Sequence, residues 1–529
     1  MTDRASRTGD AAGCVGRQSR WLGLLTLAVI VGVAVHARAF QLADRSLWFD
    51  EAYTWRLSKF SPGEVIRRSS LDNYPPLYFL VLKGWCALFG ETTEAMRALS
   101  VICGAAAGVG MYGVAREIVL FDSDAAFSRR PEAYALLTAA IVALAPLQVR
   151  WGWEVRMYAM GAALAAFASW SLLRALREAR AVMPWCFYVG FAVAFAYTHL
   201  YALLTIAAHA IFVVGNLLVQ QRAGVGPSRL GPQVRRAVLA FGAVAVGFLP
   251  WAPSMMRQAA QVKADFWSGP LSAADVAGTC GEVLVGPGVG GSTNDAVAAV
   301  LFCALSLVLL LRRAKMGDWF LFASVSVPFA LALGFSAGGR NIVVGRYFVF
   351  AQLFFLAAVA RLVTRVRWPA ARLALAMVLL LSCALACADL RRRSDVVLRP
   401  GARGQAAYLD AHRRPGEPIV VRSPLLYFPV RFHLADRRLC YLLSDGREWR
   451  HFEGGPVFRE SDMISPEELT LTAAPRVWVI DGWGNCSIPL PSTWREVSRE
   501  TCPDVHAFQG SMVRIEFAND RREPIEAIP

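Results

Sequence analysis

Long apolar runs dominate this chain and limit what it can fold into. A helix needs about 20 mostly apolar residues to span the hydrocarbon core of a bilayer. Runs that approach or exceed this length occupy residues 21–40, 98–119, 133–149, 156–173, 185–197, 200–218, 237–253, 296–311, 318–336, 347–362 and 369–388. The sequence therefore predicts an all-α polytopic membrane domain of about eleven transmembrane helices.

Charge in the loops predicts the orientation of these helices. If the tail 1–20 is cytoplasmic, every second loop is cytoplasmic too, and each of those loops is basic, as the positive-inside rule requires. The basic residues are Arg129 and Arg130; Arg174, Arg177 and Arg180; Arg222, Arg229, Arg235 and Arg236; Arg312, Arg313 and Lys315; Arg361, Arg365 and Arg367. We expect a multi-pass protein of the plasma (inner) membrane with a cytoplasmic N-terminus. The net charge of +15 then reflects topology rather than nucleic-acid binding.

An odd number of spans places the C-terminal part outside the cytoplasm. We expect a cytoplasmic tail 1–20, a membrane domain 21–388 with its first outer loop at 41–97, and an extracytoplasmic domain 389–529. The last segment contains turn-forming Pro-Gly pairs and short runs of residues that favour β-strands, and this pattern predicts a small α/β fold. The expected strands lie at 418–421, 476–480 and 511–517, and a helix is expected at 405–412.

Cysteine and tryptophan residues in the C-terminal segment leave two questions open. Cys486 and Cys502 could form a disulfide if the segment is exported, whereas no Cys/His spacing typical of a metal site is present. Trp478, Trp483 and Trp494 could stack on sugars, although buried core positions are the more common explanation.

The first outer loop carries the first candidate residues. Asp50 and Glu51 lie among aromatic residues just beyond a predicted span, where a carboxylate could act as a general base. The structural alternative is the acidic first turn of a helix, which the helix dipole favours. Tyr74 precedes Pro75 and Pro76, which fix a stiff entry into the next apolar run.

A second outer loop pairs an acid with a base. Glu154 and Arg156 precede Tyr158 at the entrance of a predicted span, next to a break at Pro146. Charged groups this close to the bilayer are costly and are often functional. The alternative is an internal salt bridge between the two.

Further polar residues are expected on the same outer side. They are His199, Lys263, Arg340 and Arg346. Cations on the outer side run against the positive-inside trend and suggest an anion to be bound, since arginine pairs well with phosphate. For each cation alone, an interfacial anchor is the alternative.

The order of these motifs resembles the GT-C glycosyltransferases, and within them the bacterial branch near the protein O-mannosyltransferases and lipid A aminoarabinose transferases (glycosyltransferase family 39). The resemblance rests on Leu-Trp-Phe-Asp-Glu-Ala at 47–52, Asn-Tyr-Pro-Pro-Leu-Tyr at 73–78, Phe-Gly at 89–90, Arg97 and Glu-Val-Arg-Met-Tyr at 154–158. Relatives often have His at the position of Tyr74 and Ala at that of Val155, which leaves the branch and the sugar open.

The resemblance implies transfer of a sugar from a polyprenyl-phosphate carrier to an extracytoplasmic acceptor, with inversion. Asp50 would be the general base, and Glu51 would orient the loop or the acceptor. Glu154 and Arg156 would shape the donor site, while Arg340 or Arg346, together with Lys263, would meet the lipid phosphate. The donor is a lipid-linked sugar, and nothing in the sequence indicates a divalent metal.

A transporter or flippase of lipid-linked envelope precursors is the competing class. It would also place charges in a helical bundle, but such proteins usually contain repeated halves and helices broken at mid-membrane. The sequence shows no such symmetry. The acceptor stays open among a glycan, a lipid and a protein.

Overall fold

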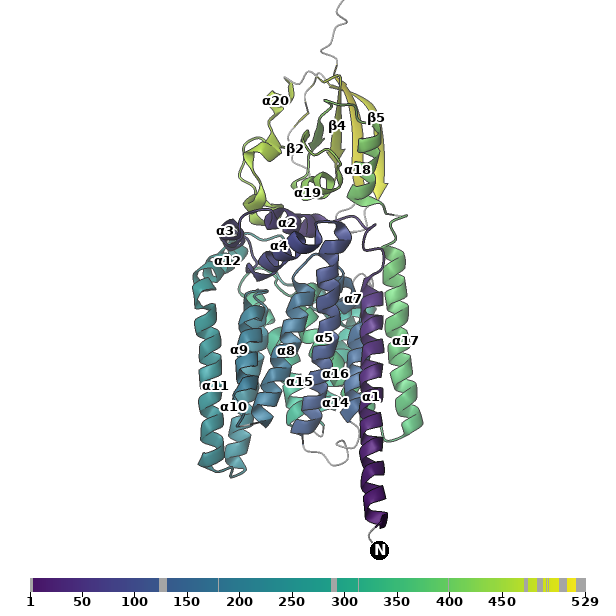
Figure 1. Ribbon diagram of the computed structural model, residues 1–529. Coiled ribbons are helices and arrows are strands. Elements are labelled where there is room, and N and C mark those ends of the chain that lie inside the picture. Colours follow the sequence, from purple (N-terminus) through teal and green to yellow (C-terminus); the bar gives the residue numbers. More distant parts are fainter. Residues whose placement is uncertain are drawn as a thin grey trace, which may run out of the picture. The chain divides into compact units, whose positions relative to one another are not determined.

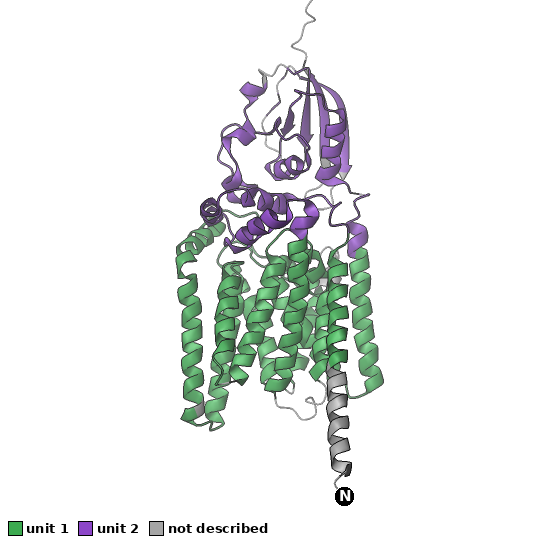
Figure 2. Ribbon diagram, viewed as in Figure 1, with its two compact units in different colours: residues 1–40, 98–389 green, residues 41–97, 390–529 purple. Residues whose placement is uncertain are grey.

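The computed structural model of the chain describes residues 3–122, 131–178, 180–286, 293–312, 314–397, 399–470, 474–482, 489–490, 492, 494–503 and 511–519. The chain forms two compact units, which are described separately (Figure 2). Unit 1 comprises residues 1–40 and 98–389, and unit 2 comprises residues 41–97 and 390–529. Five residues named above lie outside the described residues: Arg129, Arg130, Arg313, Trp483 and Cys486.

Unit 1 is built of helices that run side by side (Figure 1). Its α-helices are α1 (Asp3–Arg38), α5 (Thr93–Phe121), α6 (Pro131–Leu144), α7 (Pro146–Gly152), α8 (Tyr158–Arg177), α9 (Met183–Ala196), α10 (Ala202–Arg222), α11 (Pro227–Phe248), α12 (Ala252–Ala264), α13 (Ala273–Val285), α14 (Thr293–Leu311), α15 (Met316–Ala337), α16 (Val349–Thr364) and α17 (Pro369–Arg393). Two short 3-10 helices, η1 (Leu249–Trp251) and η2 (Gly345–Phe348), precede α12 and α16.

The helices of unit 1 confirm a polytopic membrane architecture. Among the described residues, eight helices are long and apolar enough to cross a bilayer, and the bent pair α6–α7 would make nine. The apolar helix α9 and the apolar part of α14 are shorter. The predicted apolar runs coincide with helices of this unit; run 133–149 covers both α6 and α7, and run 237–253 extends from α11 through η1 into α12. The number of spans stays a prediction.

The break between α6 and α7 sets the direction of α7, the helix that precedes Glu154 and Arg156. Pro146 begins α7, and the two helix axes differ by 57°. Gln148 is buried on α7, and its amide nitrogen donates to the Val349 carbonyl at 2.7 Å and to the Gln352 side chain at 2.9 Å. The Gln352 amide in turn donates to the Val283 carbonyl at 2.5 Å. Buried amides thus join α7, α16 and α13.

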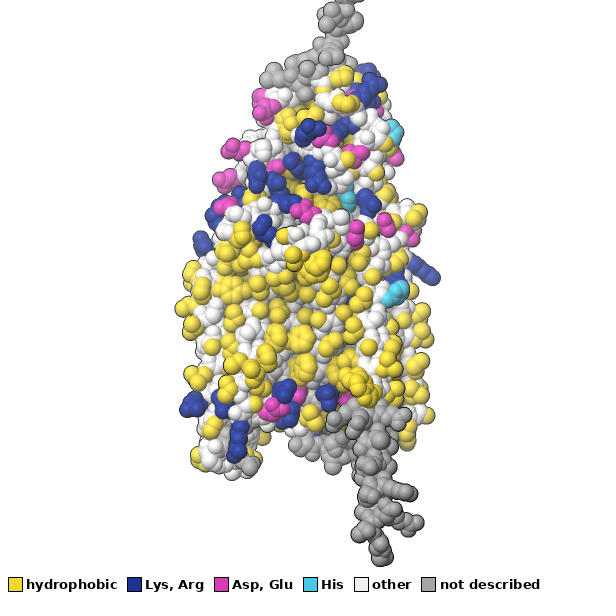
Figure 3. Space-filling model, in the orientation of Figure 1, with side chains coloured by type: hydrophobic (Ala, Val, Ile, Leu, Met, Phe, Trp, Pro, Cys, Tyr) yellow, Lys and Arg dark blue, Asp and Glu magenta, His cyan; other side chains and the backbone are white. Residues whose placement is uncertain are grey.

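The basic ends of the unit 1 helices hold ion pairs. Arg361 is 2% exposed, donates from Nε to Asp318 at 2.7 Å and also contacts Asp122. Arg177 donates to Glu117 at 2.7 Å. Figure 3 shows lysine and arginine side chains at the lower border of the apolar band of this unit. Basic loops that the sequence assigns to one side of a membrane therefore contact one another.

Unit 2 contains a mixed six-stranded sheet in the order β3-β2-β1-β4-β6-β5. The strands are β1 (Ile419–Val421), β2 (Cys440–Leu443), β3 (Met463–Ile464), β4 (Arg476–Asp481), β5 (Trp494–Pro503) and β6 (Ser511–Asn519). β1 pairs in parallel with β2 and β4, and β2 pairs in parallel with β3. β6 is antiparallel to β4 and β5. The small α/β fold is confirmed, with β1, β4 and β6 at the expected strands.

The helices of unit 2 come from both of its chain segments. They are α2 (Phe49–Ser58), α3 (Pro62–Leu71), α4 (Leu77–Phe89), α18 (Gly401–His412), α19 (Pro424–His433) and α20 (Pro466–Thr470), with the 3-10 turns η3 (His451–Glu453), η4 (Gly455–Val457) and η5 (Glu460–Asp462). α19 packs against both α2 and α18. The first outer loop and the C-terminal segment therefore share one compact unit.

Two of the tryptophans belong to the interior of unit 2. Trp478 is 1% exposed and donates from its indole nitrogen to Glu417 at 3.0 Å. Trp494 is 7% exposed and packs in the core with Phe517. The core explanation is confirmed for both. Cys440, on β2, is fully buried.

Candidate functional site

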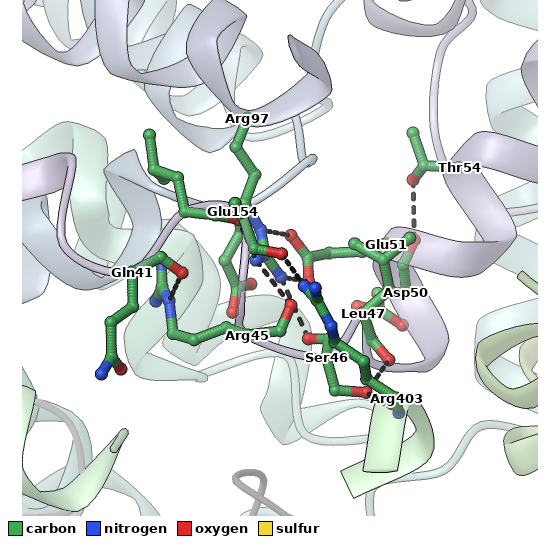
Figure 4. Close-up of polar contacts among 12 residues, drawn as sticks. Gln41, Arg45, Ser46, Leu47, Asp50, Glu51, Thr54, Arg97, Glu154 and Arg403 are labelled. Atoms are coloured by element: carbon green, nitrogen blue, oxygen red, sulfur yellow. Dashed lines mark hydrogen bonds and ion pairs between the residues drawn. The ribbon is translucent and has the colours of Figure 1, made fainter. Parts of the chain in front are cut away.

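Asp50 and Glu51 lie in the first turn of α2. Trp48 precedes the helix without a side-chain cap, so the acidic first turn faces amide groups that α2 itself leaves unpaired. Asp50 is half-buried, whereas Glu51 is fully buried. The Thr54 hydroxyl donates to the Asp50 backbone carbonyl at 2.7 Å and so fixes this turn from within (Figure 4). The two neighbouring carboxylates therefore have different environments.

Arg97 holds Glu51 and the preceding loop together. Its Nε and Nη2 donate to the two carboxylate oxygens of Glu51 at 2.9 and 2.6 Å. Nη1 donates to the carbonyls of Leu42 and Arg45 at 2.9 Å each, and Nη2 also donates to the Ser46 carbonyl at 3.0 Å (Figure 4). All five N–H groups of this guanidinium are used. Glu51 is thus part of a buried network that shapes the approach to Asp50.

Residues of the C-terminal segment hold the same loop. The Arg403 amide donates to the Ser46 hydroxyl at 3.3 Å, and its guanidinium donates to the Ala43 carbonyl. The Leu47 amide donates to Nε2 of His433, the last residue of α19, at 3.0 Å. Leu47 is three residues before Asp50. Unit 2 therefore positions the Asp50 turn from two distant parts of the sequence.

The contact with Leu47 requires a neutral His433. Burial and the neighbouring Arg97, Arg403 and Arg437 lower the pKa of His433 to about 3. A neutral ring with an unprotonated Nε2 can accept the amide proton, whereas an imidazolium cannot.

Acidification below pH 6.5 is therefore expected to destabilise unit 2. The pKa of His433 is lower in the folded chain than in the unfolded chain. The full contribution of His433 to the free energy of unfolding is therefore present above pH 6.5, and it is lost as the pH falls toward 3. The loss is up to about 1.4 kcal/mol per pH unit. Thermal unfolding of the full chain between pH 7.5 and pH 5 measures it. His433→Gln should reduce the slope and the exposed His412→Gln should not; an unchanged slope in His433→Gln would contradict the assignment.

Tyr74 lies in the connection between α3 and α4. This connection runs from Asp72 to Pro76, and α4 begins at Leu77 directly after the two prolines. Tyr74 is half-buried, whereas Pro75, Pro76 and Asp72 are buried. The prolines fix the entry into α4, as the sequence predicts.

In unit 1, Glu154, Arg156 and Tyr158 lie at the junction of α7 and α8. Glu154 is 2% exposed and forms an ion pair with Arg150, one turn earlier on α7. Arg156 is also 2% exposed. The Tyr158 ring packs edge-on against Trp151 with ring centroids 4.9 Å apart. Glu154 and Arg156 are therefore buried at this junction, and Arg150 is half-buried beside them.

His199 joins this junction to a second one, between α9 and α10. Its ring lies 5.9 Å from that of Tyr158 and 5.5 Å from that of Tyr347. Nδ1 accepts a hydrogen bond from the Tyr201 amide at 3.1 Å, which leaves the ring proton on Nε2 in the neutral form. Burial, followed by Arg156 and Arg346, lowers the pKa of His199 to about 3.

Arg346 approaches the cluster from η2. Its guanidinium lies over the rings of Trp267 and Tyr347, at 5.1 and 5.3 Å from their centroids. Glu282 on α13 packs directly against Gly345, where a side chain would clash with its carboxylate. Burial raises the pKa of Glu282, and Arg346 and Arg150 oppose this rise. Four segments of unit 1 thus meet here, three of them predicted from the sequence. We call the residues that meet the donor-side cluster, after the role that the family resemblance implies for Glu154 and Arg156: Arg150, Glu154, Arg156, Tyr158, His199, Glu282 and Arg346.

Lys263 lies in the last turn of α12, and Arg340 lies on the loop between α15 and η2. Arg340 donates to the Ser268 carbonyl at 3.4 Å, and the Ser268 hydroxyl donates to the Asn341 carbonyl at 2.6 Å. The Lys263 side chain lies 3.5 Å from the place where Gly339 would carry a Cβ atom. These two cations are therefore neighbours, and Trp267 links their loop to Arg346.

Several residues of these sites were not singled out from the sequence. Arg150 could have been found, because it lies four residues before Glu154 between two predicted spans, a spacing at which opposite charges can pair if the chain is helical. Glu282, Trp267 and His433 carry no local signal, since their partners lie far away in the sequence. Among the described residues, no three His, Cys, Asp or Glu side chains form a group that could hold a metal ion.

Known structures share this architecture over almost the whole chain. The crystal structure of ArnT from Cupriavidus metallidurans bound to undecaprenyl phosphate aligns with 97% of this chain and 99% of its own, at a TM-score of 0.55 and 14% identity. The chain has the GT-C fold. The apo state of the same GT-C protein aligns with 95% of this chain and 98% of its own, at a TM-score of 0.53 and 13% identity.

Three further comparisons found a family match over part of the chain, a structure with a lower TM-score and no curated sequence. The family described as dolichyl-phosphate-mannose-protein mannosyltransferase matches residues 73–224, which include Tyr74, Glu154, Arg156, Tyr158 and His199. The oligosaccharyltransferase AglB from Archaeoglobus fulgidus aligns with 87% of this chain and 69% of its own, at a TM-score of 0.49 and 11% identity. No curated protein sequence matches the chain. The resemblance to GT-C proteins inferred from the sequence is confirmed at the level of the fold.

Proposed function

We propose that this GT-C protein transfers a sugar from a polyprenyl-phosphate carrier to an extracytoplasmic acceptor, with inversion at the anomeric carbon. The observation that carries the proposal is the donor-side cluster, in which Arg150, Arg156 and Arg346 lie around the buried Glu154, the half-buried Glu282 and a neutral His199. The similar ArnT structure contains undecaprenyl phosphate, which supports a lipid phosphate as the anion that these arginines bind.

The proposed reaction needs one base and a stabilised leaving group. Asp50 takes the proton from the acceptor hydroxyl, whose oxygen forms the new bond to the anomeric carbon. The bond from that carbon to the carrier phosphate breaks, and the phosphate leaves with the electron pair. Arg156 and Arg346 stabilise this anion, because cations in a water-poor site act strongly on developing charge.

Glu51 has a positioning role in this proposal. Its two carboxylate oxygens accept from Arg97 in a fully buried environment. Because Glu51 is buried and paired with Arg97, it holds the first turn of α2 in place. Asp50 is half-buried, so its carboxylate is the one that can contact an acceptor hydroxyl. Glu154 holds Arg150, and Tyr158 and His199 form the wall of the donor-side cluster.

The proposed membrane topology of the protein follows the positive-inside rule. The N-terminus and the loops with the ion pairs of Arg177 and Arg361 would be cytoplasmic. The ends of unit 1 that carry the donor-side cluster, and the whole of unit 2, would face outward. A cysteine-labelling scan with a membrane-impermeant reagent on intact cells would test this directly.

Release of the free carrier phosphate tests the function. The purified full chain is incubated with polyprenyl-linked sugars extracted from its native host, and the lipids are analysed by mass spectrometry. We expect free polyprenyl phosphate to accumulate with the wild type and to decrease about 10- to 100-fold with Arg346→Gln, since a hydrogen bond to a charged group contributes about 1.5–3 kcal/mol.

The matched control is Arg222→Gln, which removes an exposed arginine at the end of α10. This variant should release the carrier phosphate like the wild type. If the wild type moves the lipid across a vesicle membrane and leaves the carrier glycosylated, the protein is a flippase and the proposal is wrong.

A further inference from the structure

Four arginines of unit 2 surround one phenylalanine ring and one carboxylate. The Phe60 ring is 5% exposed and has the guanidinium carbons of Arg68, Arg459 and Arg56 at 3.9, 4.7 and 5.6 Å from its centroid. Arg431 joins them through Asp462. We call Arg56, Arg68, Arg431 and Arg459 the Phe60 arginine cluster.

The carboxylates in contact with this cluster are too few to neutralise it. Asp462 is 1% exposed and pairs with Arg56 at 2.7 Å and with Arg431 at 3.4 Å. Glu64 pairs with Arg68 at 3.0 Å but is shared with Arg67. Within the described part of the chain, Arg56, Arg68 and Arg431 share these two carboxylates, and Arg459 has no ion-pair partner. An excess of two positive charges follows.

This excess has an energetic cost in the absence of an anion. Burial lowers the pKa of Arg56, and Arg459 and Arg431 add to this effect against the attraction of Asp462. Like charges in a partly buried site repel one another more strongly than in water. The Phe60 ring face offsets part of the cost through cation–π contact, which contributes about 0.5–1 kcal/mol at exposed sites.

We propose that the Phe60 arginine cluster binds a phosphate group of the acceptor. A phosphate monoester carries about −1.5 to −2 charges at neutral pH, which matches the excess of two, and guanidinium groups bind its oxygens in pairs. Arg56 and Asp50 lie on the same helix, six residues and about 9 Å apart along the axis. This inference rests on the proposed function, because it assigns the phosphate to the molecule whose hydroxyl meets Asp50.

A binding measurement tests the proposal without any transfer reaction. The full chain in phosphatidylcholine nanodiscs is titrated into fluorescent glucose 6-phosphate and fluorescent glucose, with anisotropy as the readout. We expect saturable binding of the phosphorylated probe alone. Arg459→Gln should weaken this binding about tenfold or more. Arg459 is exposed, so its loss leaves the fold intact. Arg68→Gln serves as a second variant.

The control variant is Arg438→Gln, whose side chain is 88% exposed in the same unit and pairs with Asp436. It should bind the phosphorylated probe like the wild type, and so should Asp50→Asn, which separates this test from the transfer reaction. Equal binding by Arg459→Gln and the wild type, or equal binding of the neutral probe, would overturn the proposal.

Nanodiscs of phosphatidylglycerol distinguish two sources of the phosphate. If the cluster takes a lipid headgroup, the anionic discs should abolish binding of glucose 6-phosphate to the wild type. If it takes the phosphate of a soluble glycan, binding should be similar in both kinds of disc. Both outcomes support a phosphate site.

Discussion

Asp50→Asn is expected to lower the rate of sugar transfer by about 10²- to 10⁴-fold, the range that a positioned general base contributes. The amide has nearly the same shape but cannot take the acceptor proton. Asp50 is half-buried in the first turn of α2, and the contact that fixes this turn goes from the Thr54 hydroxyl to the Asp50 backbone carbonyl. The substitution therefore removes the base and leaves the turn in place.

The decisive measurement is single-turnover transfer with saturating donor, together with donor binding. We expect the transfer rate to decrease and donor affinity to stay within a factor of two or so. Asp44→Asn is the matched control, because Asp44 lies in the same loop with its side chain 58% exposed. Full transfer activity in Asp50→Asn would remove this residue from the mechanism.

Arg97→Met is expected to destabilise the protein by about 3–5 kcal/mol, the cost of leaving a buried charge unpaired. The variant removes both hydrogen bonds to the fully buried Glu51. It also removes the donors to the carbonyls of Leu42, Arg45 and Ser46. The loop before Asp50 loses its shape, so transfer should fall along with the unfolding temperature.

The effect of burial can be separated from the effect of charge. Arg67→Met breaks an exposed pair with Glu64 and should cost less than about 1 kcal/mol. Glu51→Gln keeps an acceptor for Arg97 and should be milder than Arg97→Met. Thermal unfolding of the three variants in the same detergent tests this order. A cost for Arg67→Met equal to that for Arg97→Met would mean that burial of the pair is unimportant.

The local features of the fold could be predicted from the sequence. Apolar length marks the helices of unit 1, and Pro146 marks the bend before the outer-loop residues. The short β-rich runs at 418–421, 476–480 and 511–517 form strands of the sheet. These predictions succeed because each depends on neighbouring residues, through helix length, proline geometry and β-propensity.

Contacts between distant segments could not be predicted in this way. The sequence shows that Glu154, Arg156 and Arg346 are charged residues next to predicted spans, but not that His199 lies beside them. Nor does it show that His433 accepts from the Leu47 amide. Such contacts depend on side-chain complementarity in the folded chain, and a single sequence carries no record of it.

Unit 2 is assembled from two chain segments with most of unit 1 between them. About 290 residues separate its halves, and at about 5–20 residues per second their synthesis takes roughly 15–60 s. During this time Arg97 is already available to Glu51, because both belong to the early half. The hydrogen bond from the Leu47 amide to His433 and the ion pair of Arg56 with Asp462 can form only after the last segment has been synthesised. A nascent chain stalled before residue 390 would therefore expose the face of α2 that α19 later covers, and protease digestion of such stalled chains should cut the first outer loop until the last segment is released.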